Sequence, residues 1–520
     1  MKNLLALPAL LAIITALTAV SGYLRELSLA MTFGAGVYTD AYFVAAAIPM
    51  VAGDLLVGSV LTACVVPVFA PLMQDGAVQS PEVRRAVSAL FVLVAAVSVA
   101  VAIALRFAVP ALVDALSPGF GPATHEYTLR LARALVWLLP LNAMVLLPSL
   151  LLNAARTYVV PGSAWLVVNL VFVAIVHAGY PSLGPDVLIW GPLLGPLVMA
   201  VTLYWRLGAR GLRPAVAPNF GASPVHQALR LARPVMLTGG IGSGLGILMI
   251  CHLLLRSFGS TYGAGVVSSL GYAFRLYEVP VSLVVATAGT LVFTELSRLA
   301  PNRERERFVA HCRDLLAWGI ILLVPTVLLT AVFADTLVRV LFERGAFTSE
   351  AARLTVRALR GFCAAILFES ILMVGLRVLY ALRRPGFAVL IGAATIAALV
   401  VSATLARQSH SVIALAGALS ASFALAAVLV VASIGRALGK SIVPPAREML
   451  IACTLAGAAA GVTAVLRQRL APTGLAWDGA LIAGYGLLYG TGLALLCPAR
   501  WAEVNSRLGT AVRSIRVRSS

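Results

Sequence analysis

Apolar runs of roughly 20 residues recur from one end of the chain to the other, and short polar loops separate them. A helix of that length covers the ~30 Å hydrocarbon core of a bilayer. The alternation of polar and apolar residues over ~10 positions that is typical of an outer-membrane barrel strand is not found. We therefore predict an all-α integral membrane protein of about fourteen transmembrane helices, centred near residues 14, 56, 96, 142, 168, 196, 244, 282, 327, 368, 396, 423, 457 and 486.

The first apolar segment, residues 4–20, follows Lys2 and has small residues near Ser21, as a signal peptide does. Segments of the same kind repeat through the whole chain, which favours a retained first helix. Residues 21–50 and 271–298 lie almost half a chain apart, and each places an arginine near an acid and follows it with proline. This spacing is compatible with two facing bundles of about seven helices.

Composition agrees with a membrane protein, because 61% of the 520 residues are hydrophobic and 11% are charged. The net charge of +19 could indicate a nucleic-acid partner, but the arginines are scattered through short loops and form no soluble basic domain. With fourteen spans, one side of the membrane collects 25 of the 39 Lys and Arg residues and the other collects 13, with Arg275 inside a span. The positive-inside rule then predicts that both termini are cytoplasmic.

Enzyme and metal signatures are absent from the sequence. We find no HExxH, GxSxG or Walker loop and no paired acidic motif, and the six histidines are dispersed. The six cysteines stand alone, without the spacing of a metal site or a disulfide framework. The sequence predicts neither an enzyme nor a cofactor or metal.

Charged residues inside the spans are the candidates for function, because such residues usually face a bundle interior or a wet cavity. Arg275 and Glu278 share one helix face and form either a structural ion pair or an anion site, since guanidinium binds two phosphate oxygens at once. Arg25 beside Glu26 allows the same two interpretations, or Arg25 extends to the membrane surface. Asp40 follows Thr39 and serves either as a helix cap or in function.

Glu369 interrupts the apolar run "AAILFESILMV" without a cation nearby in sequence. It either hydrogen-bonds across helices together with Ser370, as polar residues in spans often do, or binds a proton or sodium ion that drives transport. We therefore regard Glu369 as a candidate for ion coupling.

Several stretches resemble the MurJ/MviN family of bacterial inner-membrane lipid flippases, within the multidrug, oligosaccharidyl-lipid and polysaccharide exporter superfamily. The resemblance covers about residues 10 to 385 and rests, in order, on "SGYLRE", "FGAGVYTDAYFVAAAIP", "SPGF", "LLNAARTYVVP", "YAFRLYEVPVSLVVATAGTLVFTELSR" and "LFERGAFT".

The resemblance implies fourteen helices in two pseudosymmetric lobes, residues 1–220 and 221–440, followed by a helix pair and basic cytoplasmic tail at 441–520. It implies alternating-access transport of lipid II, the polyprenyl-diphosphate-linked peptidoglycan precursor, from the inner to the outer leaflet of the cytoplasmic membrane. In the family a cationic cavity between the lobes receives the diphosphate and the last two helices hold the lipid tail. Arg25, Asp40, Arg275 and Glu278 match the substrate-binding positions. Membrane lipids and proteins of cell-wall synthesis are the further partners it implies.

The chain departs from the family pattern at several positions that usually carry charge. Ala19 and Gly53 with Asp54 stand where the family usually has arginines, Gly58 replaces a glutamate and Phe274 an aspartate. A flippase for another lipid-linked glycan, such as an exopolysaccharide or O-antigen precursor, and a non-transporting family member therefore remain open. A drug or cation antiporter of the superfamily and a membrane glycosyltransferase are less favoured, because the former relies on acids in its cavity and the latter needs a catalytic acidic pair.

Overall fold

The structure is a computed structural model, and it describes residues 2–74, 80–214, 218–238, 244–299, 305–470 and 474–498. Every regular element in these ranges is a helix. The chain forms two compact units, Met1–Tyr272 with Leu341–Thr355 (unit 1) and Ala273–Val340 with Val356–Ser520 (unit 2).

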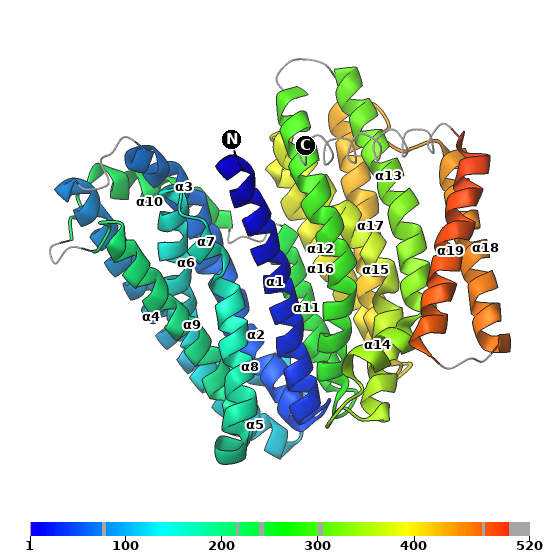
Figure 1. Ribbon diagram of the computed structural model, residues 1–520, viewed down its shortest axis with the longest axis horizontal. Helices are drawn as coiled ribbons and strands as arrows, with labels where there is room; N and C mark the ends of the chain where they lie inside the picture. The colour runs from blue at the N-terminus through cyan, green and yellow to red at the C-terminus, as the bar shows by residue number, and fades with distance from the viewer. Residues whose placement is uncertain are drawn as a thin grey trace. The chain divides into compact units, whose positions relative to one another are not determined.

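Unit 1 contains the helices of the first half of the chain (Figure 1). These are α1 (Lys2–Phe33), α2 (Val37–Gly53), η1 (Asp54–Gly58), α3 (Ser59–Gln74), α4 (Pro81–Leu116), α5 (Pro122–Leu135), α6 (Leu138–Ala154), α7 (Val159–Gly162), α8 (Ala164–Leu183), η3 (Gly184–Asp186), α9 (Val187–Ala209), α10 (Ser223–Thr238) and α11 (Gly244–Ser260).

Unit 2 contains most of the helices of the second half. These are α13 (Arg305–Val332), α16 (Pro385–Arg407), α17 (Val412–Leu438), α18 (Ala446–Leu470) and α19 (Leu475–Leu496). Three helices have residues in both units: α12 (Val266–Leu299), α14 (Ala334–Phe342) and α15 (Ser349–Ala381).

In the described part of the chain, ten helical stretches are long and apolar enough to cross a membrane. They are Ala9–Phe33, Pro81–Leu116, Pro122–Ala154, Ala164–Ala209, Arg305–Val332, Ser349–Ala381, Pro385–Arg407, Val412–Leu438, Ala446–Arg469 and Ala476–Leu496, and the shorter apolar helices are Val37–Gly53, Ser59–Met73 and Gly246–Ser260.

The stretch Ala164–Ala209 holds two helices, α8 and α9, which pack against each other, so it accounts for two crossings.

Each of the predicted span centres falls within a described helix. The prediction of an all-helical membrane fold is confirmed. The predicted lobes, residues 1–220 and 221–440, are defined by counting helices. The two compact units are defined by which backbone segments lie close together, so they do not test the lobes, which stay a prediction. The predicted basic tail, residues 499–520, lies outside the described residues.

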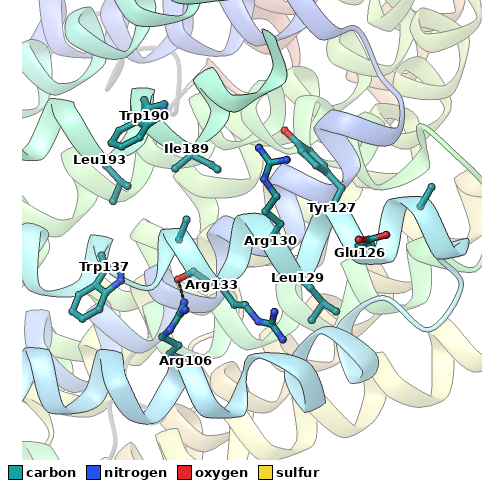
Figure 2. Close-up of a pocket in the computed structure, with 12 residues that line it drawn as sticks. Arg106, Glu126, Tyr127, Leu129, Arg130, Arg133, Trp137, Ile189, Trp190 and Leu193 are labelled. Atoms are coloured by element: carbon teal, nitrogen blue, oxygen red, sulfur yellow. Dashed lines mark hydrogen bonds between the residues drawn. The ribbon is translucent and has the colours of Figure 1, made fainter. Parts of the chain in front are cut away.

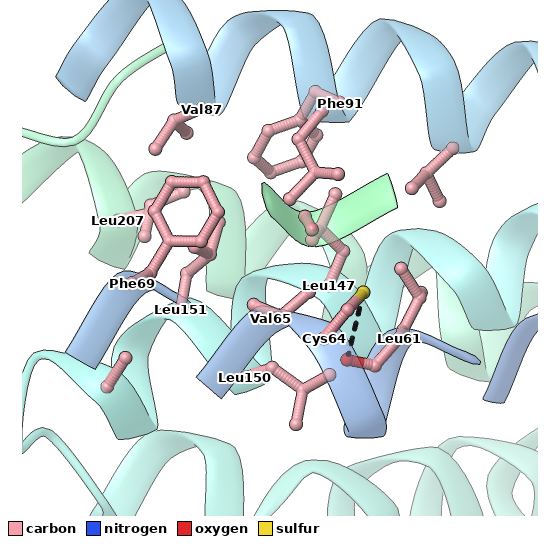
Figure 3. Packing of buried hydrophobic residues seen from close by; sticks show 14 of the residues in the cluster. Leu61, Cys64, Val65, Phe69, Val87, Phe91, Leu147, Leu150, Leu151 and Leu207 are labelled. Atoms are coloured by element: carbon pink, nitrogen blue, oxygen red, sulfur yellow. Dashed lines mark hydrogen bonds between the residues drawn. The ribbon is translucent and has the colours of Figure 1, made fainter. Parts of the chain in front are cut away.

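The core of unit 1 is formed by large apolar side chains of α3, α4 and α6 (Figure 3). Phe69 and Val65 of α3 and Leu147 and Leu151 of α6 are completely buried, and Phe91 of α4 packs with them. Lipid tails are as apolar as these side chains, so the contacts stabilise the bundle mainly through close packing and not through removal from water.

In unit 2, α18 packs against α13 and α19 (Figure 1). Hydroxyl groups of α19 bond to the backbone of α13. Pro325 has no N–H, which leaves the Ile321 carbonyl of α13 without its donor within the helix. The Tyr489 hydroxyl donates to this carbonyl at 2.7 Å. One turn away, the Tyr485 hydroxyl donates to the Pro325 carbonyl at 3.1 Å. These bonds fix α19 on α13.

Candidate functional site

Arg25 lies on α1 with its guanidinium held in place from two sides. Its Nη2 donates to Oε1 of Glu26 at 2.8 Å, and its guanidinium carbon lies 5.9 Å from the ring centre of Phe172 on α8. The Arg25 side chain is 23% exposed, whereas that of Glu26 is 4% exposed. The pair is thus an ion pair whose arginine keeps access to a ligand.

Arg25 lies in a row of polar side chains between α1 and α8, which sequence reasoning missed. Ser21, Arg25 and Ser28 share one face of α1, because they follow one another at four and three residues. The Asn169 amide of α8 donates to Ser21 Oγ at 3.1 Å, and Ser28 Oγ lies 3.1 Å from His177 Nε2. Asn169, in an apolar helix, was the available sequence signal.

Asp40 lies near the start of α2, where it binds the first turn of α12. Its Oδ2 accepts from the Gly265 N–H at 2.6 Å, and its Oδ1 accepts from the Ser268 N–H at 2.7 Å and the Ser268 hydroxyl at 2.6 Å. The residue is 1% exposed. A carboxylate is favourable at a helix N-terminus, where backbone N–H groups lack partners.

The geometry of Asp40 supports the capping alternative, although the capped helix is α12 and not α2. The N-terminus of α2 is closed by Thr39, whose hydroxyl accepts from the Gly36 N–H at 3.0 Å. Direct substrate binding by Asp40 stays a prediction.

Two motifs of unit 1, "FGAG" at 33–36 and "LFERGAFT" at 341–348, meet at the same end of the unit as Asp40. The Ala346 N–H donates to the Met31 carbonyl at 2.8 Å, and the Tyr272 hydroxyl donates to the Gly34 carbonyl at 3.1 Å. Gly345 has a φ of +59°, and a Cβ there would lie 2.4 Å from the Met31 oxygen. The glycine of "LFERGAFT" is therefore required by the approach of this loop to α1.

In unit 2, Arg275 and Glu278 of α12 form the predicted ion pair. Arg275 Nη1 and Glu278 Oε2 lie 3.1 Å apart, and the side chains are 36% and 39% exposed. Tyr277, between them in sequence, is completely buried and packs on Phe362 of α15 with ring centres 5.1 Å apart. One face of α12 is thus anchored in the unit while Arg275 and Glu278 remain accessible.

Glu369 of α15 is 3% exposed and accepts a hydrogen bond from the side chain of Tyr277. The prediction of a bond across helices is therefore correct, but the suggested role of Ser370 is wrong. The Ser370 hydroxyl donates to the Ile366 carbonyl of its own helix at 2.7 Å. Tyr277 connects Glu369 directly to the helix of Arg275 and Glu278.

Two further arginines bond to backbone inside apolar helices, although sequence reasoning assigned them to loops. Arg256 of α11 donates to the Phe43 carbonyl of α2 at 2.7 Å, and Arg377 of α15 donates to the Val285 carbonyl of α12 at 2.9 Å. Each stands in an apolar run, "CHLLLRSFGS" and "MVGLRVLY", which was the signal available.

The positions where the family usually has arginines show small or acidic residues in this chain. Ala19 is exposed on α1, and Gly53 ends α2 just before the π-helical segment η1, which begins at the exposed Asp54. π-helical turns within α-helices are often found at functional sites. The local charge here is the opposite of that expected for a phosphate-binding surface.

The sequence profile of the family described as "Lipid II flippase MurJ" matches residues 29–478. The chain belongs to the MurJ family. The predicted family is confirmed, and this MurJ-family chain is a multi-pass membrane protein.

Curated relatives carry the same description. A probable lipid II flippase MurJ of Rhizobium meliloti is 27% identical over 347 residues, which are 63% of this chain and 61% of the relative. The lipid II flippase MurJ of Burkholderia cenocepacia is 27% identical over 362 residues, 66% of this chain and 67% of the relative. The aligned part of this MurJ-family chain thus spans about three fifths of the first relative's length.

Solved structures show that the fold is shared. A lipid II flippase MurJ in an inward closed conformation aligns with a TM-score of 0.76 at 18% identity, over 94% of this chain and 98% of the other. An inward-facing multidrug transporter of the MATE family aligns with a TM-score of 0.64 at 13% identity, over 80% and 98%.

Proposed function

We propose that this chain is a flippase that moves a polyprenyl-diphosphate-linked glycan, lipid II, from the inner to the outer leaflet of the cytoplasmic membrane by alternating access. The observation that carries the proposal is the family match over residues 29–478, which includes the helix of Arg275 and Glu278. Both termini lie on the cytoplasmic side, and proteins of cell-wall synthesis are its partners.

The physical problem of such transport is the headgroup. A diphosphate does not cross hydrocarbon unaided, whereas the isoprenoid tail gains ~0.8 kcal/mol for each CH₂ that stays in lipid. The protein therefore has to offer donors to the phosphates while the tail remains in the bilayer. Arginine suits this purpose because its planar donors match two phosphate oxygens and it stays charged.

We assign the phosphate contacts to Arg25 in unit 1 and Arg275 in unit 2. Each arginine is partly exposed and is paired with a neighbouring carboxylate, Glu26 or Glu278. These carboxylates orient the guanidinium groups and reduce their net charge. Binding then stays weak enough for the cargo to be released, which a transporter requires.

Glu369 is our candidate for ion coupling. Its burial and its bond to Tyr277 place a carboxylate next to the anchored face of α12. Binding or release of a proton or sodium ion at Glu369 changes the charge beside the helix that carries Arg275, which is how a driving ion can alter the binding helix.

Depletion of the protein in its host tests the function. We expect lipid II to accumulate and to be protected from a cleaving enzyme added outside the cells, and re-expression of the chain to restore cleavage. If a different lipid-linked glycan accumulates, that glycan and not lipid II is the cargo. Ala19, Gly53 and Asp54, at positions where the family usually has arginines, favour this alternative. If no lipid-linked intermediate accumulates, the chain is not a flippase.

A further inference from the structure

A basic hollow of about 900 Å³ lies on unit 1 among α4, α5 and α9 (Figure 2). Arginines from two helices line it, Arg106 of α4 with Arg130 and Arg133 of α5. Trp137 and Trp190 lie to one side of these arginines. Arg25 and Arg275 are not among the residues that line the hollow, and its size is in the range of small-molecule sites.

The amphipathic pattern of α5 explains why arginines face the hollow. Thr128, Leu131 and Leu135 are completely buried on one side of the helix. Arg130 and Arg133 are exposed on the other side, at a spacing that keeps them on one face. The exposed face of α5 therefore places Arg130 and Arg133 on the surface of unit 1.

Arg106 is fixed by the break between α5 and α6. The N–H of Trp137 donates to the Ala134 carbonyl, so it does not take up the Arg133 carbonyl as a continuing α-helix would. Arg106 Nη1 donates to the Arg133 carbonyl at 2.9 Å. This bond uses one of the five N–H groups of Arg106 and holds its guanidinium at the hollow.

The other two arginines differ in how far they are neutralised. Arg130 forms an ion pair with Asp186 and lies 6.0 Å from the ring centre of Tyr127. The side chain of Arg133 makes no hydrogen bond or ion pair with any described residue. Glu126 is the only acid among the described residues that line the hollow. The positive charge of Arg106 and Arg133 is therefore in excess, and the hollow attracts an anion.

Large apolar side chains next to the hollow are exposed. Phe107 of α4, beside Arg106, is 81% exposed, and Leu197 of α9, about one turn beyond Leu193, is 44% exposed, as expected for side chains that contact acyl chains. Trp137 and Trp190 are of the type that gathers at the level of lipid headgroups. An anion that reaches this place most readily is therefore one attached to a lipid.

From this arrangement we propose that the hollow binds the phosphate of an anionic glycerophospholipid, with Arg106 and Arg133 as its donors. Trp137 and Trp190 contact the glycerol and upper acyl region. This site is independent of cargo transport, and under the predicted orientation it takes its lipid from the outer leaflet.

Lipid binding to the purified full-length chain tests the proposal. Native mass spectrometry measures the affinity for phosphatidylglycerol and for phosphatidylcholine. The parent protein is compared with a pair of substitutions in one chain, Arg106→Ala with Arg133→Ala, and with a control pair in one chain, Arg407→Ala with Arg469→Ala. Both control arginines are exposed and outside the hollow. We expect the first pair to weaken phosphatidylglycerol binding roughly tenfold, while the control pair binds as the parent does.

Arg133→Ala alone keeps the fold intact, because Arg133 makes no side-chain bond to a described residue, and it too should weaken phosphatidylglycerol binding. Equal loss in the control pair, or parent-like affinity in both hollow variants, would overturn the proposal. So would equally tight binding of phosphatidylcholine. If equimolar glycerol phosphate displaces bound phosphatidylglycerol, the hollow is a site for free anions. If undecaprenyl diphosphate displaces it preferentially, the hollow binds a polyprenyl ligand. Either result contradicts the phospholipid assignment.

Discussion

At the scale of single residues, the charges that stand in apolar helices are each matched to a specific partner. Asp40 is the clearest case, because both of its carboxylate oxygens accept hydrogen bonds from the start of α12. Arg25 and Arg275, in contrast, each form an ion pair with a neighbouring carboxylate and remain partly exposed. Burial and bonding thus distinguish Asp40, which is fully bonded inside unit 1, from the two arginines, which remain accessible.

Replacing Asp40 by Asn tests this separation. The amide keeps the size but loses the charge and one acceptor oxygen, so we expect the free energy of unfolding to fall by about 1.5–3 kcal/mol. Ser268→Ala removes one of the three bonds and should cost less. Thermal unfolding of the purified variants measures both losses. If Asp40→Asn kept the parent's stability but lost lipid II binding, Asp40 would contact cargo directly.

Replacing Gly345 by Ala tests the loop that carries "LFERGAFT". An alanine at this left-handed position costs about 1–2 kcal/mol in conformational energy, and its Cβ would also collide with the Met31 oxygen. We therefore expect a loss of at least about 2 kcal/mol in unfolding free energy. Gly457→Ala, in α18 with open space around it, is the control and should not destabilise the protein. Equal stability of both variants would refute the close approach of the loop to α1.

The sequence could indicate which residues are unusual but not which groups they bind. Asp40 and Glu369 are recognisable because a carboxylate is costly in an apolar helix. Their partners, Ser268 and Tyr277, are far away in sequence and are of residue types common in ordinary helices. Arg256 and Arg377 were assigned to loops because helix ends cannot be located to within a turn from composition alone.

At the scale of helices, hydrophobic pattern predicts the spans well, since each apolar run must satisfy its own backbone in lipid. Contacts between helices depend on details that the pattern does not contain. The pairing of Tyr489 with the carbonyl released by Pro325 is one such detail. It is recognisable from the sequence only once α13 and α19 are known to be neighbours.

Tyr489→Phe removes the donor to the Ile321 carbonyl, which has no replacement within α13. We expect a loss of about 0.5–1.5 kcal/mol in unfolding free energy. Tyr485→Phe is the matched control, because the carbonyl it contacts can still accept from Leu329 in the continuing helix, and it should cost less. The midpoints of thermal unfolding in detergent compare the two. A larger loss for Tyr485→Phe would contradict the role assigned to Pro325.

At the scale of the whole molecule, the distribution of arginines predicts orientation, with the N-terminal side cytoplasmic. Thiol labelling of spheroplasts with a membrane-impermeant reagent checks it. In a Cys453→Ser background, we expect Ser409→Cys, at one end of α17, to be labelled from outside. Ser441→Cys, at the other end, should be labelled only after permeabilisation. The reverse pattern would invert the predicted orientation and move the basic hollow to the inner leaflet.

The central claim is that Arg25 and Arg275 hold the phosphorylated headgroup of the cargo during transport. The most direct measurement is the fraction of lipid II that an externally added enzyme cleaves in cells that depend on this chain. Variants carrying Arg25→Ala and Arg275→Ala together are predicted to lower that fraction at least tenfold at equal protein level, while Arg407→Ala leaves it unchanged. Parent-like cleavage in the double variant would contradict the account.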